Sequence, residues 1–154
     1  MTRDHIRDYA TAAFRLYAAQ GRPSAEALRE KIFGETLRKA RQRETLGIKG
    51  RIGKPTEQAL LAAEGALEKR AAELNDLLAV ENTLFILEKQ GRRHDIISAV
   101  EAVYFADAHK DLGRGDISAR VRRASLFIPA GEATVYRHLR YARRLFAIER
   151  GLRL

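Results

Sequence analysis

The sequence predicts an all-α fold, with a helical N-terminal region that includes a long helix and a helix-turn-helix at the C-terminal end. Apolar residues recur at steps of three and four, which is the spacing of one helix face, and no clear stretch alternates polar and apolar residues as a strand does. Glycine and proline interrupt this pattern at intervals and so mark the expected helix ends. Hydrophobic residues make up 45% of the 154, which is enough for a packed core.

The first two helices are expected over residues 4–20 and 24–43. Gly21-Arg22-Pro23 separates them, and the side-chain oxygen of Ser24 suits the N-cap of the second helix. The residues expected to face inward are Ile6, Ala10, Ala13, Phe14 and Tyr17 in the first helix and Leu28, Ile32 and Leu37 in the second.

A basic, glycine-rich loop is expected over 44–55, followed by a long helix over about 57–90 with Thr56 as its N-cap. An apolar stripe runs along this helix, partly at seven-residue steps: Leu60, Leu67, Ala71, Leu74, Leu78 and Phe85. Such a stripe packs against another helix, either in the same chain or in a second copy, so a homodimer stays open as an alternative.

The remaining helices are expected over 94–109, from Asp116 or Ser118 onward, and over 132–149, where Gly151 ends the last one. In the middle helix of these three, the apolar face comprises Ile117, Val121, Ala124 and Phe127. We therefore expect a helical N-terminal region over 1–90 and a helix-turn-helix domain over 91–154.

The formal net charge of +9 is distributed unevenly along the chain. Residues 38–54 have a net charge of +6, residues 55–113 have −5 and residues 114–154 have +7, with all ten cations of the last block being arginine. Arginine suits bidentate contacts with phosphate and guanine. A polyanion is the expected partner, double-stranded DNA before an acidic membrane surface.

The last helix has the two faces that a DNA-recognition helix needs. At about 100° per residue, the apolar side comprises Val135, Leu139, Ala142 and Phe146, and the opposite side comprises Ala133, Arg137, Arg140 and Arg144. Because residues near the start of a recognition helix reach base edges, the candidates for base reading are Thr134, Tyr136, Arg137 and Arg140. The candidates for DNA-backbone contact are Arg120, Arg122, Arg123, Arg143 and Arg144.

Three segments resemble phage transcriptional regulators of the RinA type: AVEAVYF (99–105), GDISARVRRASL (115–126) and TVYRHLRYARRLFAIERGL (134–152). The pieces ATAAFRLYA and KPTEQALLAAEGALEKR extend the resemblance over nearly the whole chain. The resemblance implies a helix-turn-helix like that of sigma-factor region 4, related to ArpU-type regulators, and activation of phage or prophage late genes, including packaging genes. It places Thr134, Arg137 and Arg140 at base-contacting positions.

The residues expected in an enzyme or a metal site are not found together in the sequence. There is no cysteine, the four histidines are scattered, and no nucleophile motif or complete phosphate-binding loop occurs. Asp107-x-His109-x-Asp111 is interpreted as a solvated helix end rather than a metal site. We expect no catalysis and no cofactor. A cytoplasmic protein without a membrane span is expected, because no run of about 18 apolar residues exists and MTRDHIRDYA is too charged for a signal peptide.

Several alternatives stay open. A small-terminase-like DNA-packaging protein also joins a helix-turn-helix to a helical oligomerisation region, and a helical adaptor without DNA binding would use the 57–90 stripe. A sigma-like domain would instead contact RNA polymerase, with the acidic helices over 57–111 as the candidate surface. The basic segment 38–54 is either a linker or a second contact to the DNA backbone.

Overall fold

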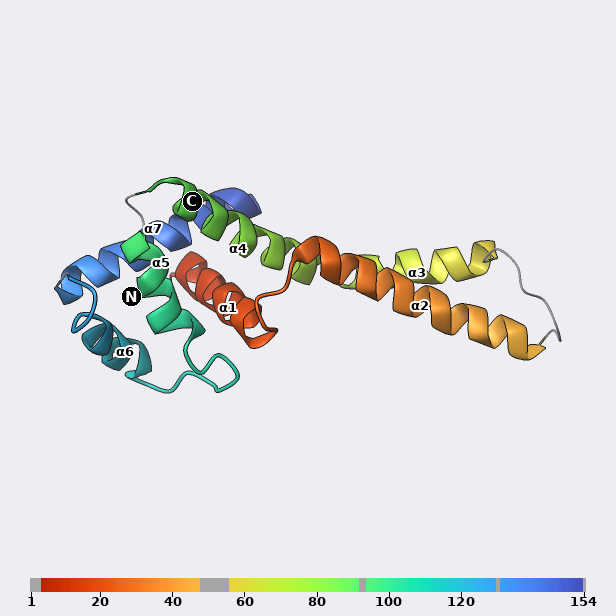
Figure 1. The fold of residues 1–154 in the computed structure, drawn as a ribbon, viewed down its shortest axis with the longest axis horizontal. Helices are drawn as coiled ribbons and strands as arrows, with labels where there is room; N and C mark the ends of the chain where they lie inside the picture. Colours follow the sequence, from red (N-terminus) through yellow and green to blue (C-terminus); the bar gives the residue numbers. More distant parts are fainter. Residues whose placement is uncertain (1–3, 48–55, 92–93, 130, 154) are drawn as a thin grey trace. The chain divides into compact units, whose positions relative to one another are not determined.

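The structure is a computed structural model and describes residues 4–47, 56–91, 94–129 and 131–153. Every regular element in these ranges is helical: α1 (His5–Ala19), α2 (Ala25–Gly47), α3 (Glu57–Lys69), α4 (Ala71–Lys89), α5 (His94–Val100), the π-helix η1 (Glu101–Phe105), α6 (Asp116–Ala124) and α7 (Glu132–Arg150) (Figure 1). The predicted all-α class is confirmed.

The helices form two compact units. The first unit, here called the bundle, contains α1, α5, η1, α6, α7 and α4 from Asp76 onward. The second unit spans residues 24–75 and contains α2 and α3, here called the hairpin. This division differs from the expected boundary at residue 90, because α1 packs on η1 and α7 although it lies far from them in sequence.

The core of the bundle is built around Phe14 of α1, whose side chain is fully buried. Its ring stacks on Tyr104 of η1 with centroids 5.6 Å apart, and Phe146 of α7 lies 5.7 Å away. The predicted inner face of α7 is confirmed, since its members are all fully buried: Val135, Leu139, Ala142 and Phe146. One aromatic cluster thus holds three helices together.

The hairpin has a core of small side chains. Helices α2 and α3 lie side by side (Figure 1), and the buried residues are Ala25, Ile32, Ala59 and Ala63. Thr56 caps α3 as predicted, because its Oγ1 accepts a hydrogen bond from the Ala59 N–H at 3.2 Å, and it also bonds the Glu44 carboxylate. The predicted loop start at residue 44 is wrong, since α2 continues to Gly47; residues 48–55 lie outside the described ranges.

The long helix expected over 57–90 is divided at Arg70. The backbone there has φ −106° and ψ 13°, and its N–H bonds the carbonyl of Leu67, three residues back. The guanidinium pairs with Glu73 at 2.8 Å across the break. No glycine or proline marks this position, so the sequence pattern offers no signal for it.

The predicted apolar stripe is not the buried face of α3 and α4. Phe85 is 58% exposed, and Leu60 and Leu78 are also exposed. The buried residues of α4 are instead Leu77, Ala79, Val80, Thr83 and Leu87. The prediction from seven-residue steps assumed one continuous helix. It therefore selected a helix face that is rotated by about one residue from the face that is buried.

Two further boundaries differ from the expected ones. The helix predicted over 94–109 is α-helical only to Val100, continues as a π-helix to Phe105, and stops at Ala106, where ψ is 131°. The predicted inward Phe127 is 62% exposed, because α6 ends at Ala124 and the chain turns so that Ile128 is buried in its place.

A polar contact ties α1, α4 and α7 of the bundle. Tyr9 donates its hydroxyl hydrogen to Asp76 Oδ1 at 2.5 Å, and Arg150 Nε donates to the same oxygen at 2.7 Å. Burial raises the pKa of Tyr9, with the Asp76 hydrogen bond and charge adding to the effect, and the Asp76 hydrogen bond raises the pKa of Arg150. The contact therefore favours the neutral phenol in the folded state.

We expect Tyr9→Phe to lower the free energy of unfolding by about 1 kcal/mol at neutral pH, the worth of one such hydrogen bond. Because the folded pKa of Tyr9 is raised, its contribution is complete below the unfolded value of about 10 and disappears as the pH rises through the folded pKa. Denaturant titrations between about pH 8 and pH 11 should show the wild type and Tyr9→Phe converging. Tyr136→Phe serves as control, and a constant difference across that range would contradict the prediction.

Candidate nucleic-acid interface

Glycines bound the segment that comprises α6, the connection over 125–131 and α7. Gly115, with φ +82°, precedes α6, a backbone conformation that glycine adopts without steric cost. The side chain of Asp116 then accepts a hydrogen bond from the Gly113 N–H at 2.6 Å, so α6 starts at Asp116, one of the two predicted positions. At the other end α7 stops at Gly151, as predicted, where φ is +78° and the Leu152 N–H bonds the Ala147 carbonyl.

The predicted base-reading residues lie on the first half of α7. Tyr136, Arg137 and Arg140 are exposed, and Thr134 is half-buried. The hydroxyl of Thr134 accepts a hydrogen bond from the Arg137 guanidinium at 3.3 Å, so these two side chains lie together. Arg137 and Arg140 lie on the exposed side of the helix, opposite its fully buried face, and Thr134 and Tyr136 flank them.

The arginines of α7 that precede Arg150 are not neutralised. Within the described part of the chain, no carboxylate oxygen lies within 4 Å of Arg137, Arg140, Arg143 or Arg144. Arg150, at the end of the helix, is paired with Asp76 instead. Over the first three and a half turns of α7, the arginines therefore have no ion-pair partner among the residues that the structure describes.

Arg120 has a different environment from the one predicted for a DNA-backbone contact. Its NH1 donates to the carbonyls of Val103 at 2.9 Å and Ala106 at 2.6 Å. Arg15 of α1 lies beside it and donates to four carbonyls, those of Tyr104, Ala106, Asp107 and Lys110. We call Arg15 and Arg120 the arginine clamp, because together they satisfy the carbonyls at the C-terminal end of η1 and in the turn that follows.

The clamp is a feature that sequence reasoning missed. Arg15 is only 8% exposed, and burial, with a smaller effect from the charge of Arg120, lowers its pKa. The signal available in the sequence was a lone charged residue on the apolar face of α1, between Phe14 and Tyr17. Its acceptors lie 89 to 95 residues further along the chain, and nothing local identifies them.

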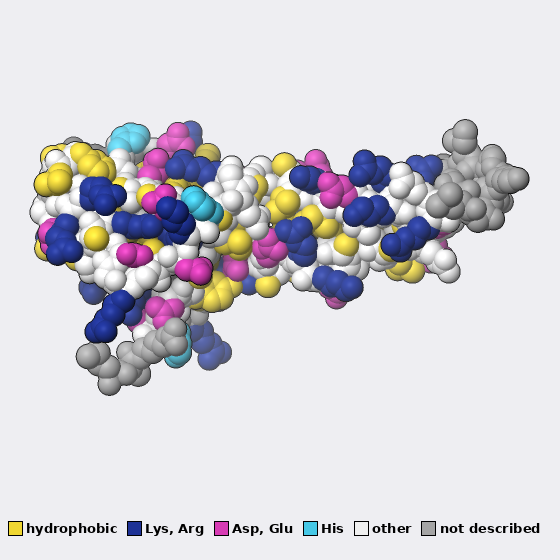
Figure 2. Space-filling view, turned by 90° about the horizontal axis from the view of Figure 1, so that it is seen from below, with side chains coloured by type: hydrophobic (Ala, Val, Ile, Leu, Met, Phe, Trp, Pro, Cys, Tyr) yellow, Lys and Arg dark blue, Asp and Glu magenta, His cyan; other side chains and the backbone are white. Residues whose placement is uncertain are grey.

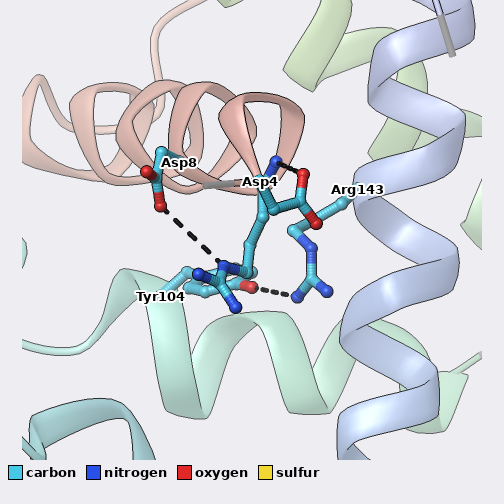
Figure 3. Close-up of polar contacts among 5 residues, drawn as sticks. Asp4, Asp8, Tyr104 and Arg143 are labelled. Carbon is cyan, nitrogen blue, oxygen red and sulfur yellow. Dashed lines mark hydrogen bonds and ion pairs between the residues drawn. The ribbon is translucent and has the colours of Figure 1, made fainter. Parts of the chain in front are cut away.

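The other arginines that were predicted to contact the DNA backbone divide into two groups. Arg122, Arg123 and Arg144 are exposed. Arg143 is half-buried and donates to the hydroxyl of Tyr104 at 2.7 Å, as Figure 3 shows between α7 and η1. The first group lies at the surface, whereas Arg143 lies deeper in the bundle.

A groove of about 1430 Å³ lies within the bundle, between α1, the segment that joins η1 to α6, and α7. Ala133, Tyr136, Arg137 and Arg140 of α7 line one side, so most of the predicted reading residues face it. The other sides add Arg7, Lys110 and the carboxylates of Asp8 and Asp111. Cations outnumber carboxylates along the lining.

The surface also exposes apolar side chains between α6 and α7, where Leu126 is 85% exposed and Phe127 lies beside it. Figure 2 shows one face of the chain, on which Lys and Arg side chains occur on the bundle and on the hairpin, with carboxylates among them. No described helix is both long enough and apolar enough to cross a bilayer. Among the described residues, no group of three or more His, Asp or Glu side chains is placed to hold a metal ion.

No protein-family model matches the sequence, and neither does any curated protein or solved structure. The likeness to RinA-type regulators stays a prediction from the residues quoted above.

Proposed function

We propose that the chain is a sequence-specific DNA-binding transcription regulator that uses α7 as its recognition helix. The observation that carries the proposal is the contrast between the two sides of α7: one is fully buried against the bundle, and the other exposes arginines that have no carboxylate partner in the described part of the chain. Unpaired arginines on a rigid helix match the negative potential and the guanine edges of the major groove.

The dimensions of α7 suit this role. Its 19 residues extend over about 28 Å, and the first two turns, with Thr134, Tyr136, Arg137 and Arg140, come directly after the connection from α6. A helix of ordinary diameter enters the major groove, which is about 12 Å wide. Arg122, Arg123 and Arg144 are exposed on α6 and on the later part of α7, where they would meet phosphates and set the register.

The biological setting of this function comes from the resemblance to RinA-type regulators. It makes the chain an activator of phage or prophage late genes, acting together with RNA polymerase. Arg120 is not part of the proposed interface, because its guanidinium is occupied by carbonyls of η1.

A small-terminase-like packaging protein is the second candidate. The hairpin forms a unit of its own and exposes two adjacent leucines of α3, Leu60 and Leu61, as an oligomerisation element would. The mass of the protein in solution separates the two candidates, since a ring of many copies identifies the packaging protein and a monomer or dimer the regulator. A helical adaptor without DNA binding is the outcome if no duplex binds.

The first test is binding to duplex DNA as a function of salt. We expect the affinity to fall steeply between about 50 and 200 mM salt, because each neutralised phosphate releases counterions. Selection of bound sites from a random pool should recover a common sequence. If no duplex binds even at the lowest salt concentration, the proposed function is wrong.

Arg137→Ala and Arg122→Ala form a matched pair of exposed arginine variants. Arg137→Ala should cost roughly 1–3 kcal/mol on the selected site and much less on random DNA, because a base contact is lost. Arg122→Ala should weaken both DNAs alike and reduce the salt slope by about 1, because a phosphate contact is lost. An equal effect of Arg137→Ala on both DNAs would remove its base-reading role but leave DNA binding itself intact.

A further inference from the structure

The floor of the bundle groove contains a hydroxyl with an unused hydrogen. Tyr104 of η1 is only 2% exposed, yet it is one of the residues that line the groove. Its hydroxyl oxygen accepts a hydrogen bond from Arg143 NH1 at 2.7 Å (Figure 3). Among the described residues no acceptor lies within hydrogen-bond distance of the Tyr104 O–H.

A buried hydroxyl normally both donates and accepts, and arginine can only donate. Arg143 therefore satisfies the oxygen of Tyr104, and the hydrogen of this hydroxyl has no acceptor within the described ranges. The guanidinium of Arg143 itself has several N–H groups and no carboxylate within 4 Å in the described ranges. Both side chains present hydrogen-bond donors to one region of the groove, and the group that satisfies both must be an acceptor, preferably an anion.

The charges around these donors point to phosphate. Arg140 and Arg7 line the same groove from α7 and α1, and Lys110 lines it from the segment after η1. Two carboxylates, Asp8 and Asp111, also line the groove, and Asp8 is paired with Arg7 at 3.8 Å, which offsets part of its charge. Phosphoryl oxygens accept charge-assisted hydrogen bonds from several donors at once. A carboxylate has only two oxygens and fits this number of cations less well.

We propose that the groove is a phosphate-binding site in which Arg143 and the Tyr104 hydroxyl hold a phosphoryl group. The groove, at about 1430 Å³, is larger than the roughly 300–1,000 Å³ typical of small-molecule pockets and is lined by Arg137 and Arg140 of α7, which favours a phosphate of the DNA backbone as its source. That assignment of source rests on the proposed function, whereas the phosphate chemistry of the site does not.

The experiment measures the unfolding temperature of the full chain in inorganic phosphate and in chloride at equal ionic strength. We expect phosphate to raise the midpoint by about 4 °C in the wild type, through binding to the folded state. Tyr104→Phe keeps the ring and its stacking on Phe14, and it should lose most of this increase. Tyr17→Phe removes another buried tyrosine hydroxyl, outside the groove, and should keep it.

Any general stabilisation by phosphate is the same in all variants, so the difference between variants reports the site. An increase of the same size in Tyr104→Phe and in the wild type, or no increase in either, would overturn the proposal. Arg143→Gln should also lose the increase. Because Tyr104→Phe retains every ring contact, the result does not depend on whether Arg143→Gln folds.

Duplex binding then identifies the source of the phosphate. If it is the DNA backbone, Tyr104→Phe weakens specific and random duplexes alike by about tenfold without changing the salt slope, since no charge is removed. If duplex binding stays at the wild-type level while the phosphate effect is lost, the site takes a phosphate group of a free ligand. If no duplex binds the wild type, the proposed function fails and the phosphate titration still decides the site.

Discussion

Phe14→Ala is expected to lower the free energy of unfolding by about 4 kcal/mol, the largest effect of any single substitution considered for this protein. The side chain is fully buried, and its ring contacts rings on both η1 and α7. Its removal leaves a cavity at the point where three helices meet. The lost transfer free energy and the cavity add together.

Urea titration followed by circular dichroism measures this change. Phe85→Ala is the matched control, because Phe85 is 58% exposed and the Lys89 ammonium lies over its ring, 5.4 Å from the centroid. The control should cost less than about 1 kcal/mol. A loss below about 2 kcal/mol for Phe14→Ala would contradict the assignment of this cluster as the core of the bundle.

Arg15→Met is expected to lower the free energy of unfolding by about 3 kcal/mol. Methionine retains much of the length and the apolar stem but cannot donate, so the carbonyls of Asp107 and Lys110 lose the donor that the arginine provides. Arg15→Lys should recover only part of the loss, because one ammonium cannot reproduce the planar fork that reaches four carbonyls.

Arg7→Met on the same helix is the control for Arg15→Met. The Arg7 side chain is 56% exposed and its ion pair with Asp8 has a long N–O distance of 3.8 Å, so its loss should change stability by no more than about 0.5 kcal/mol. Equal effects of the two substitutions would show that the arginine clamp does not stabilise the bundle. Arg120→Met should likewise lower stability, in contrast to Arg122→Ala, whose effect should be confined to DNA binding.

The candidate site could be predicted in part. The angular pattern of α7 placed Arg137 and Arg140 opposite its apolar face, with Thr134 and Tyr136 flanking them, since the helical period relates residues a few positions apart. Tyr104 could not be found in this way. Its ring belongs to the apolar pattern of η1, and only the approach of Arg143 from another helix shows that its hydroxyl faces a groove.

The incorrect predictions about the fold have a common origin. The break at Arg70 involves no glycine or proline, and the choice between the Leu78 face and the Leu77 face of α4 depends on the helices that pack against it. The exchange of Phe127 for Ile128 in the core depends in the same way on where the chain turns after α6. None of these features is specified by the residues within a single helical turn.

The sequence by itself determined the helical class, the inner faces of α1 and α7, and the capping residues Thr56 and Gly151. These features depend on the 3.6-residue period and on local backbone hydrogen bonds, which neighbouring residues specify. Only the tertiary structure decided that Arg15 and Arg120 stabilise the carbonyls after η1, and that Arg143 and Tyr104 meet in a groove. Those contacts join side chains to acceptors far away in sequence, where a charged residue has the same local pattern whether it faces solvent or a buried carbonyl.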